Sequence, residues 1–196
     1  MARFTVDTHL FRELGELLVG RESTALVELI KNAYDADATQ VTVHGENLHE
    51  PSTGRIVISD NGVGMTPPEF EGGFLRIASR IKEEGSRSSI KFNRRFTGAK
   101  GIGRLAAHKL ARFIRIYSVP SREKNDSDRV AVNATIDWDI VENYQTLEEL
   151  GDSGAIQLST EPILGKAKPG TTIELKRLRK KWSPAERARF FAEVQT

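Results

Sequence analysis

Residues 28–38, Glu28-Leu-Ile-Lys-Asn32-Ala-Tyr-Asp35-Ala-Asp37-Ala38, are the stretch that decides the fold of this chain. Apolar residues recur here at helical spacing and form a stripe made of Leu26, Leu29, Ile30 and Ala33. This spacing predicts a helix over residues 23–34 with one buried face.

The same helix carries a second, polar face. Glu28, Asn32 and Asp35 are separated by four and then three residues, so they lie on one side of a helix. A carboxylate and a carboxamide one turn apart suit a site in which one group handles water and the other binds Mg2+ through oxygen. The alternative is a solvated face on which Lys31 pairs with Glu28 and Asp35.

Three further motifs follow in order along the chain. Asp60-Asn-Gly-Val-Gly-Met65 comes directly after an apolar strand, Gly98-Ala-Lys-Gly-Ile-Gly103 opens a helix, and Gly170-Thr-Thr-Ile173 opens a strand. A carboxylate at the end of a buried strand can accept a hydrogen bond from an exocyclic amine, and nearby glycines allow a flat ligand to approach closely. A glycine-rich helix start directs N–H groups at an anion such as phosphate. Without a ligand, the first motif is a strand-end turn and the second a helix-entry turn.

Together, the four elements resemble the GHKL ATPase superfamily, which includes type II topoisomerase ATPase domains, ninety-kilodalton heat-shock chaperones, mismatch-repair ATPases and sensor histidine kinases. The resemblance extends from Leu17 to Leu178. It implies the Bergerat fold, a two-layer α/β sandwich in which a mixed, mostly antiparallel sheet has helices on one face. The residue pattern supports this fold class independently, because there are about six strand candidates and too few helices for a regular βαβ repeat.

The resemblance also implies cofactors and residue roles. ATP and Mg2+ are the implied cofactors, with Glu28 as the catalytic base and Asn32 as the Mg2+ ligand. Asp60 would bind the adenine amine, supported by Asp35 and the hydroxyl of Thr171. The remaining implied nucleotide-binding residues line the base or the phosphates: Gly62, Gly64, Met65, Lys100, Gly101, Ile102, Gly103 and Arg104.

Residues 66–100 form the least regular long segment and have an unusual charge imbalance. Between Arg76 and Lys100 there are eight basic residues but only two acidic ones, Glu83 and Glu84. A basic loop between two glycine motifs is typical of a lid over polyphosphate, although a solvated loop without ligand contact has the same composition. In the resembling family this interval is the ATP lid, so we expect the lid here.

The remaining pattern predicts a single domain over residues 1–196. Helices are expected over residues 8–20, 101–113 and 183–194, with the first packing beside the helix of residues 23–34. Residues 137–150 fit either an extended edge or a partial helix. Strands are expected over residues 40–44, 55–59, 114–119, 130–136, 154–160 and 171–178.

Composition excludes several classes of function. The 196 residues are 38% apolar and 29% charged, which is ordinary for a globular domain. There is no cysteine for a disulfide or thiolate metal site, and the net charge of +2 does not by itself indicate nucleic-acid binding. No apolar run reaches signal-peptide or membrane-span length, so we expect a cytoplasmic protein without a membrane partner.

The end of the chain bears on partners and activity. The sequence stops shortly after the last predicted helix, which suggests the N-terminal fragment of a longer protein. In the resembling family a following domain supplies a lysine or arginine to the terminal phosphate. We therefore expect slow hydrolysis, with ATP or ADP, missing C-terminal domains and an ATP-dependent homodimer as partners.

Two alternatives stay open for the activity: a histidine-kinase-type catalytic domain and a nucleotide-binding switch without hydrolysis. Glu28 in register before Asn32, followed by Asp-Ala-Asp-Ala, favours the hydrolysing branches.

Overall fold

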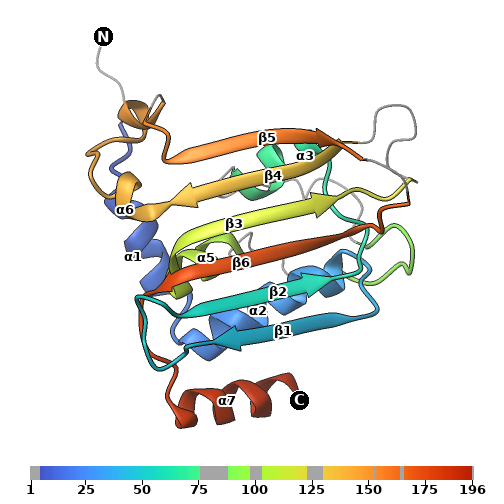
Figure 1. Cartoon of the computed structure of the whole chain (residues 1–196), viewed down its shortest axis with the longest axis horizontal. Coiled ribbons are helices and arrows are strands. Elements are labelled where there is room, and N and C mark those ends of the chain that lie inside the picture. Colours follow the sequence, from blue (N-terminus) through green and yellow to red (C-terminus); the bar gives the residue numbers. More distant parts are fainter. Residues whose placement is uncertain are drawn as a thin grey trace.

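The fold is a two-layer sandwich of one sheet and a layer of helices (Figure 1). The computed structural model describes residues 5–75, 88–97, 103–122, 130–151, 153–163 and 166–195. Its six strands have the order β1-β2-β6-β3-β4-β5, and all five pairings between them are antiparallel. The expected α/β sandwich is confirmed, and no parallel pairing occurs among the described strands.

The strands are β1 (Val41–Glu46), β2 (Arg55–Asp60), β3 (Ala111–Val119), β4 (Val130–Asp137), β5 (Ile156–Pro162) and β6 (Gly170–Leu178). The longer helices are α1 (His9–Leu18), α2 (Glu22–Asp35), α5 (Gly103–Leu110) and α7 (Pro184–Val194). Shorter helical turns are α3 (Pro67–Phe70), η1 (Glu71–Leu75), α6 (Trp138–Val141) and η2 (Leu147–Leu150).

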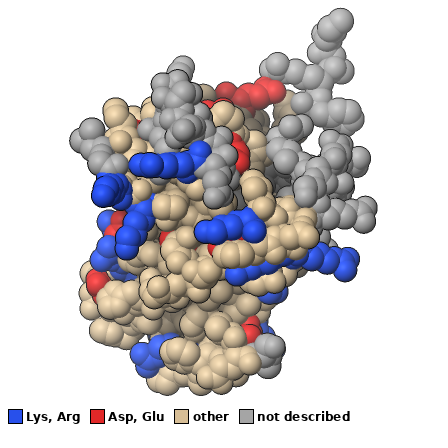
Figure 2. All heavy atoms as spheres, turned by 90° about the vertical axis from the view of Figure 1, so that its right-hand side faces the viewer, with Lys and Arg blue, Asp and Glu red and all other residues tan. Residues whose placement is uncertain are grey.

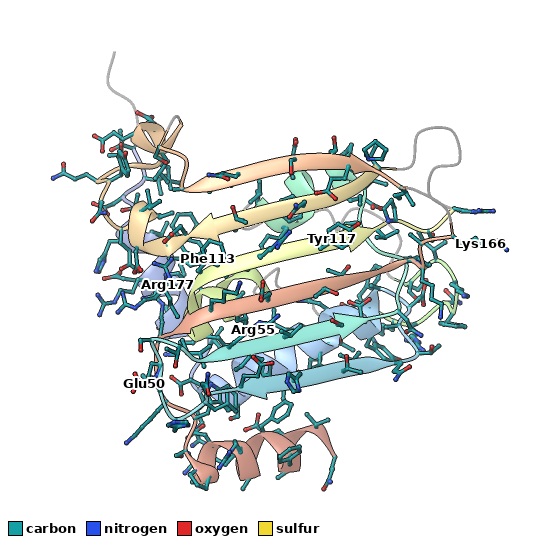
Figure 3. All side chains as sticks on the ribbon, viewed as in Figure 1. Glu50, Arg55, Phe113, Tyr117, Lys166 and Arg177 are labelled. Carbon is teal, nitrogen blue, oxygen red and sulfur yellow. The ribbon has the colours of Figure 1, made fainter. Side chains whose placement is uncertain are left out.

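Alternating side chains give the sheet one buried and one open face. In β3, Ile114 and Ile116 are fully buried, whereas Arg115 and Tyr117 between them are exposed. Because side chains alternate along a strand, the isoleucines face the helices and the polar residues face solvent. Figure 3 shows Phe113, Tyr117 and Arg55 on this open face, so the described helices cover only the other side.

The helix layer brings α2 and α5 together against the buried face. Leu26 and Leu29 of α2 are each 2% exposed, and α2 packs on α5 and on α7. The expectation that residues 8–20 would pack beside the α2 helix was wrong, since α1 packs mainly on α5. α5 therefore lies between α1 and α2.

The predicted helix over residues 101–113 extends too far. α5 ends at Leu110 and β3 begins at Ala111, which pairs with Leu178, while Phe113 pairs with Lys176 and Asp137. Pairing of Ala111 and Phe113 with neighbouring strands outweighs the local helical pattern. Residues 137–150 contain the short turns α6 and η2, so the partial-helix alternative holds there.

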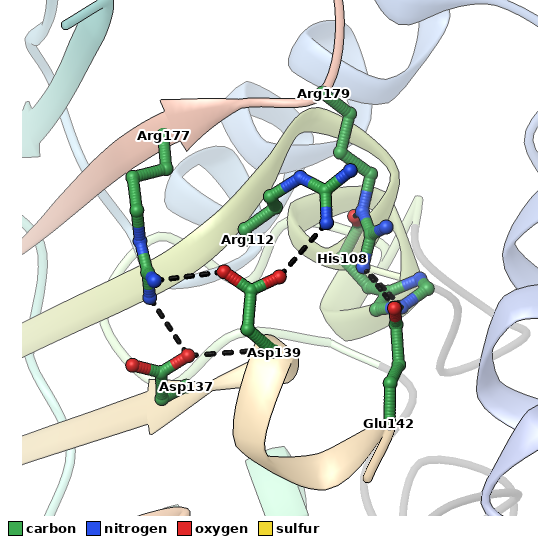
Figure 4. A network of polar contacts seen from close by, with 7 residues as sticks. All are labelled: His108, Arg112, Asp137, Asp139, Glu142, Arg177 and Arg179. Carbon is green, nitrogen blue, oxygen red and sulfur yellow. Dashed lines mark hydrogen bonds and ion pairs between the residues drawn. The ribbon is translucent and has the colours of Figure 1, made fainter. Parts of the chain in front are cut away.

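A polar network fastens the end of the sheet where α5 meets β3 (Figure 4). Arg112 and Arg177 each bind Asp139, and Arg177 also binds Asp137. Alongside, Arg179 donates to the carbonyl of His108 and to the carboxylate of Glu142. The network thus ties the end of α5 to β6 and α6.

Candidate nucleotide site

Asp60 ends β2 at the other end of the sheet and is half-buried; its surroundings, formed with Gly62, Met65 and Thr171, are called the Asp60 recess below. Its Oδ1 atom accepts hydrogen bonds from the backbone N–H groups of Gly62 (2.8 Å) and Thr171 (3.2 Å). Its Oδ2 atom makes no hydrogen bond to any described residue. Burial raises the pKa of Asp60, and the two N–H donors only partly oppose this effect. One carboxylate oxygen is thus held in place while the other is left for a further donor.

A chain of hydroxyl groups supports this recess from two strands. The hydroxyls of Thr171 and Ser118 are 2.9 Å apart, and the Ser118 Oγ atom accepts the backbone N–H of Met65 at 2.9 Å. Ser118 is fully buried on β3, opposite Thr171 in the register of β6. The structure therefore joins two predicted residues, Met65 and Thr171, through a hydroxyl that sequence reasoning missed, and Thr171 in turn donates its N–H to Asp60.

Gly64 and Gly62 are both required by close backbone contacts. Gly64 has a φ of +62°, and a Cβ atom there would lie 2.0 Å from the carbonyl oxygen of Val119. A Cβ atom on Gly62 would lie 2.5 Å from the carbonyl oxygen of Ala36. Neither position can accept a side chain without backbone movement. The turn is thereby pressed against the end of α2 and the end of β3.

The polar face of α2 shows three different arrangements. The Nζ atom of Lys31 lies 2.8 Å from the Oε1 atom of Glu28, so the ion pair that the alternative interpretation predicted is present. Asn32 is half-buried, and its carboxamide has no hydrogen-bond partner among the described residues. Asp35 is buried and its Oδ1 atom accepts both the N–H (2.8 Å) and the hydroxyl (2.9 Å) of Thr97.

Asp37 holds the segment 88–97 against the end of α2. This residue is 3% exposed, has a φ of +62°, and accepts hydrogen bonds from the Ser89 hydroxyl and from the N–H groups of Lys91 and Phe92. Burial acts to raise the pKa of Asp37, but these donors and the nearby Arg94 outweigh it and lower the pKa.

Arg94 adds a second fastening at the same place. Its Nη1 atom donates to the carbonyl oxygens of Tyr34 (3.2 Å) and Ala38 (2.7 Å), and its guanidinium lies over the rings of Tyr34 and Phe92. A cation at a helix C-terminus also complements the helix dipole. Asp37 and Arg94 together therefore hold residues 88–97 against the C-terminal end of α2.

Part of the predicted phosphate site lies outside the described residues. Lys100, Gly101 and Ile102 are in this group, as are residues 76–87 of the predicted lid. Gly103 begins α5, but the side chain of Arg104 is not described. Since α5 packs on α2, its first turn lies in the helix layer that carries Glu28 and Asn32. The phosphate contacts and the lid stay predictions.

Sequence reasoning missed Ser118, Arg94 and the role of Asp37. Ser118 is the last polar residue of Ile114-Arg-Ile-Tyr-Ser118, on the same alternation as two buried isoleucines, so periodicity could have placed it inside. Asp37 and Ser89 are 52 residues apart, and no local pattern joins them.

Comparison with known proteins decides the family. A family model described as "Histidine kinase-, DNA gyrase B-, and HSP90-like ATPase" matches residues 21–159. The chain belongs to this family. The resemblance to GHKL ATPases is confirmed, and membership supports ATP binding.

The relatives of this GHKL chain include proteins named as a restriction enzyme and as mismatch repair proteins. It is 40% identical over 115 residues to a protein of Herpetosiphon aurantiacus provisionally named type II restriction enzyme HgiDII, covering 59% of this chain and 17% of that protein. It is 44% identical over 75 residues to DNA mismatch repair protein MutL of Exiguobacterium sibiricum, covering 38% of this chain and 12% of that protein. The chain thus spans less than a fifth of either relative.

A solved structure titled "Crystal Structure of N terminal domain of a DNA repair protein" matches with a TM-score of 0.48 and 17% identity. The match covers 95% of this chain and 43% of that one. At that TM-score the likeness supports no conclusion about this chain.

Two further findings concern the described part of the GHKL chain. No helix there is long and apolar enough to cross a membrane. No group of three or more His, Cys, Asp or Glu side chains there could hold a metal ion.

Proposed function

We propose that this GHKL domain binds MgATP with the adenine in the Asp60 recess and hydrolyses it slowly as part of a longer, dimerising protein. The observation that carries the proposal is the carboxylate of Asp60. Its Oδ1 atom is fixed by two N–H donors, and its Oδ2 atom has no described partner. The exocyclic amine of adenine is a donor that fits such an acceptor, whereas guanine presents an acceptor at the same position.

Asn32 is the residue that fits Mg2+. Its carboxamide oxygen is a hard ligand without a described partner, and Mg2+ in nucleotide sites is held by one or two protein oxygens together with phosphates. The bound cation would neutralise phosphate charge. The absence of a carboxylate cluster among the described residues agrees with this division of ligands.

Glu28 is the proposed base. It would accept a proton from water as the water oxygen bonds to the γ-phosphorus and the bond to the ADP oxygen breaks. The ion pair with Lys31 competes with this role, because the same Oε1 atom contacts Lys31 at 2.8 Å. The positive charge of Lys31 makes the Glu28 carboxylate a weaker base, which supports slow turnover.

The proposal extends to partners. The relatives named above are much longer than this chain, and a following domain or a second copy would complete the phosphate site. A cytoplasmic location belongs to the same proposal.

Calorimetric titration of non-hydrolysable ATP and GTP analogues with Mg2+ tests the recess. Wild type should prefer the ATP analogue. In Asp60→Asn, the new amide must direct its oxygen at Gly62 and Thr171, so its NH2 group faces the base. ATP affinity should then fall at least about tenfold, equivalent to ~1.4 kcal/mol, while the preference moves toward GTP.

Glu28→Gln separates binding from chemistry, because it keeps the shape of the side chain but cannot accept the proton. It should bind the ATP analogue like wild type and lose phosphate release in a turnover assay. Equal loss of ATP and GTP analogue binding in Asp60→Asn would contradict the adenine assignment. Unchanged turnover in Glu28→Gln would contradict the base assignment.

A further inference from the structure

A separate cavity of about 250 Å³ lies at the loop end of the sheet. It is bounded by the turn of residues 61–63, by Ser121 and Arg122 after β3, by Lys91, and by Ala167 and Pro169 before β6. Of the described residues that were predicted to bind nucleotide, only Gly62 lines it. The volume is slightly below the usual range of ligand pockets, about 300–1,000 Å³, and so suits a small ligand.

Ser121 supplies an unused buried polar group in this cavity. The residue is 8% exposed, and its Oγ atom is buried without a hydrogen-bond partner among the described residues. Its backbone N–H is already used, since it donates to the carbonyl oxygen of Val63 at 2.8 Å. A buried hydroxyl without a partner is unfavourable, so a ligand that pairs with it gains this energy.

Two cations line the same cavity from different loops. Lys91 and Arg122 make no ion pair with any described residue, and the Nζ atom of Lys91 lies 5.4 Å from the centre of the Phe92 ring. Figure 2 faces this end of the molecule and shows more basic than acidic side chains on it. Among the described lining residues the one carboxylate is Asp37, whose oxygens already accept from the Ser89 hydroxyl and from the N–H groups of Lys91 and Phe92.

We propose that this cavity binds a small phosphorylated anion, independently of the nucleotide recess. The ammonium of Lys91 and, from a second loop, the guanidinium of Arg122 and the hydroxyl of Ser121 match the several acceptor oxygens of a phosphate group better than the two oxygens of a carboxylate. Because the N–H of Lys91 is held by Asp37, an occupant would also bridge the base of the predicted lid to the loops before β4 and β6.

Amide chemical-shift mapping of the whole 196-residue chain during titration with inorganic phosphate tests the proposal. Shifts should centre on residues 61–63, 91 and 121–122 and should persist with a saturating ATP analogue. Arg122→Gln should weaken phosphate binding at least about fivefold, and Ser121→Ala about threefold, because each loses one donor to the anion. The Asp60→Asn variant should bind phosphate like wild type.

Lys166→Gln is the matched control, since Lys166 is exposed on the same side of the molecule but does not line the cavity (Figure 3). It should leave phosphate binding unchanged. If Lys166→Gln and Arg122→Gln weakened phosphate binding equally, the effect would come from general surface charge, and the proposal of a phosphate site in the cavity would be overturned. Shifts confined to the start of α5, or competition by the ATP analogue, would overturn the proposal and assign the phosphate to the nucleotide site. If acetate bound more strongly than phosphate, the proposal that the ligand is a phosphorylated anion would be overturned.

Discussion

The carboxylate of Asp37 and the hydroxyl of Ser89 form a buried hydrogen bond that joins the end of α2 to a segment 52 residues further along the chain. The same carboxylate accepts two backbone N–H groups from that segment. The helix that carries Glu28 and Asn32 is therefore fastened to the residues that precede the glycine-rich motif.

Asp37→Asn should lower the free energy of unfolding by about 1–3 kcal/mol, because it removes charge from three hydrogen bonds. Asparagine tolerates the positive φ at this position, so backbone strain is not added. Urea unfolding followed by the fluorescence of the buried tryptophans measures the change.

The acid dependence of stability should change in the same variant. Because folding lowers the pKa of Asp37, its ionised form stabilises the fold at every pH above the pKa that Asp37 has in the unfolded chain. This contribution is lost as the pH falls through the pKa of the folded state. Asp37→Asn should therefore lose less stability on acidification than wild type. The control is Glu50→Gln, which alters an exposed carboxylate bonded to Ser52. If Glu50→Gln and Asp37→Asn changed the pH dependence of stability equally, the hydrogen bonds of Asp37 to residues 89–92 would not be its cause.

Thr97→Val should weaken binding of the ATP analogue by about three- to tenfold, because it removes the hydroxyl that Asp35 accepts immediately before the glycine-rich motif. The backbone N–H of Thr97 still donates to Asp35, and the residue is exposed, so the unfolding free energy should change by less than about 0.5 kcal/mol. Calorimetry and urea unfolding on one preparation separate the two effects. Thr42→Val, at an exposed position on β1, should leave the affinity unchanged.

Ser118→Ala should destabilise the domain by about 1–3 kcal/mol, because the N–H of Met65 and the hydroxyl of Thr171 both lose their partner in a buried place. Thermal unfolding measures the loss. Ser159→Ala is matched in chemistry, since its exposed hydroxyl makes one hydrogen bond, to the carbonyl of Asn133. If both variants unfold at the same temperature as wild type, the hydroxyl groups of Ser118 and Thr171 do not stabilise the Asp60 recess.

His108 should make stability depend on pH between 6.5 and about 4. Burial, assisted by Arg179, lowers its pKa to about 4, so the unfolded chain takes up a proton in this interval that the folded protein does not. Stability should therefore fall as pH drops from 6.5 toward 4, by at most about 3 kcal/mol. Urea unfolding at several pH values should show a shallower slope for His108→Gln. His44→Gln, at an exposed histidine, should keep the wild-type slope.

The motifs around Asp60 could be predicted because they are contiguous and their chemistry is local. Asp60, Gly62 and Gly64 lie within five residues, and a buried strand followed by this turn fixes their surroundings. The end of α5 could not be predicted, because the apolar residues Leu110, Phe113 and Ile114 fit the period of a helix as well as the approach to a strand. Only pairing with β6, formed from residues far along the chain, selects the strand.

The ion pair of Glu28 with Lys31 shows a different limit of prediction from sequence. Both the catalytic and the solvated interpretation of this helix face follow from the same spacing, and the structure contains the ion pair of the second. The two interpretations are compatible, because the ion pair uses the Oε1 atom of Glu28 and a carboxylate has a second acceptor oxygen. Asp37 lay within the quoted stretch, but its partners are too distant in sequence for any spacing rule to reveal them.

The position of β6 has a consequence for how the domain is made. This strand is the last of the sheet to be synthesised, yet it lies between β2 and β3, and among the described strands it alone pairs β1-β2 with β3-β4-β5. A nascent chain can form two separate partial sheets, but it cannot join them before residues 170–178 leave the ribosome. Thr171 arrives with the same strand, so the recess at Asp60 is completed only when the two halves close around it.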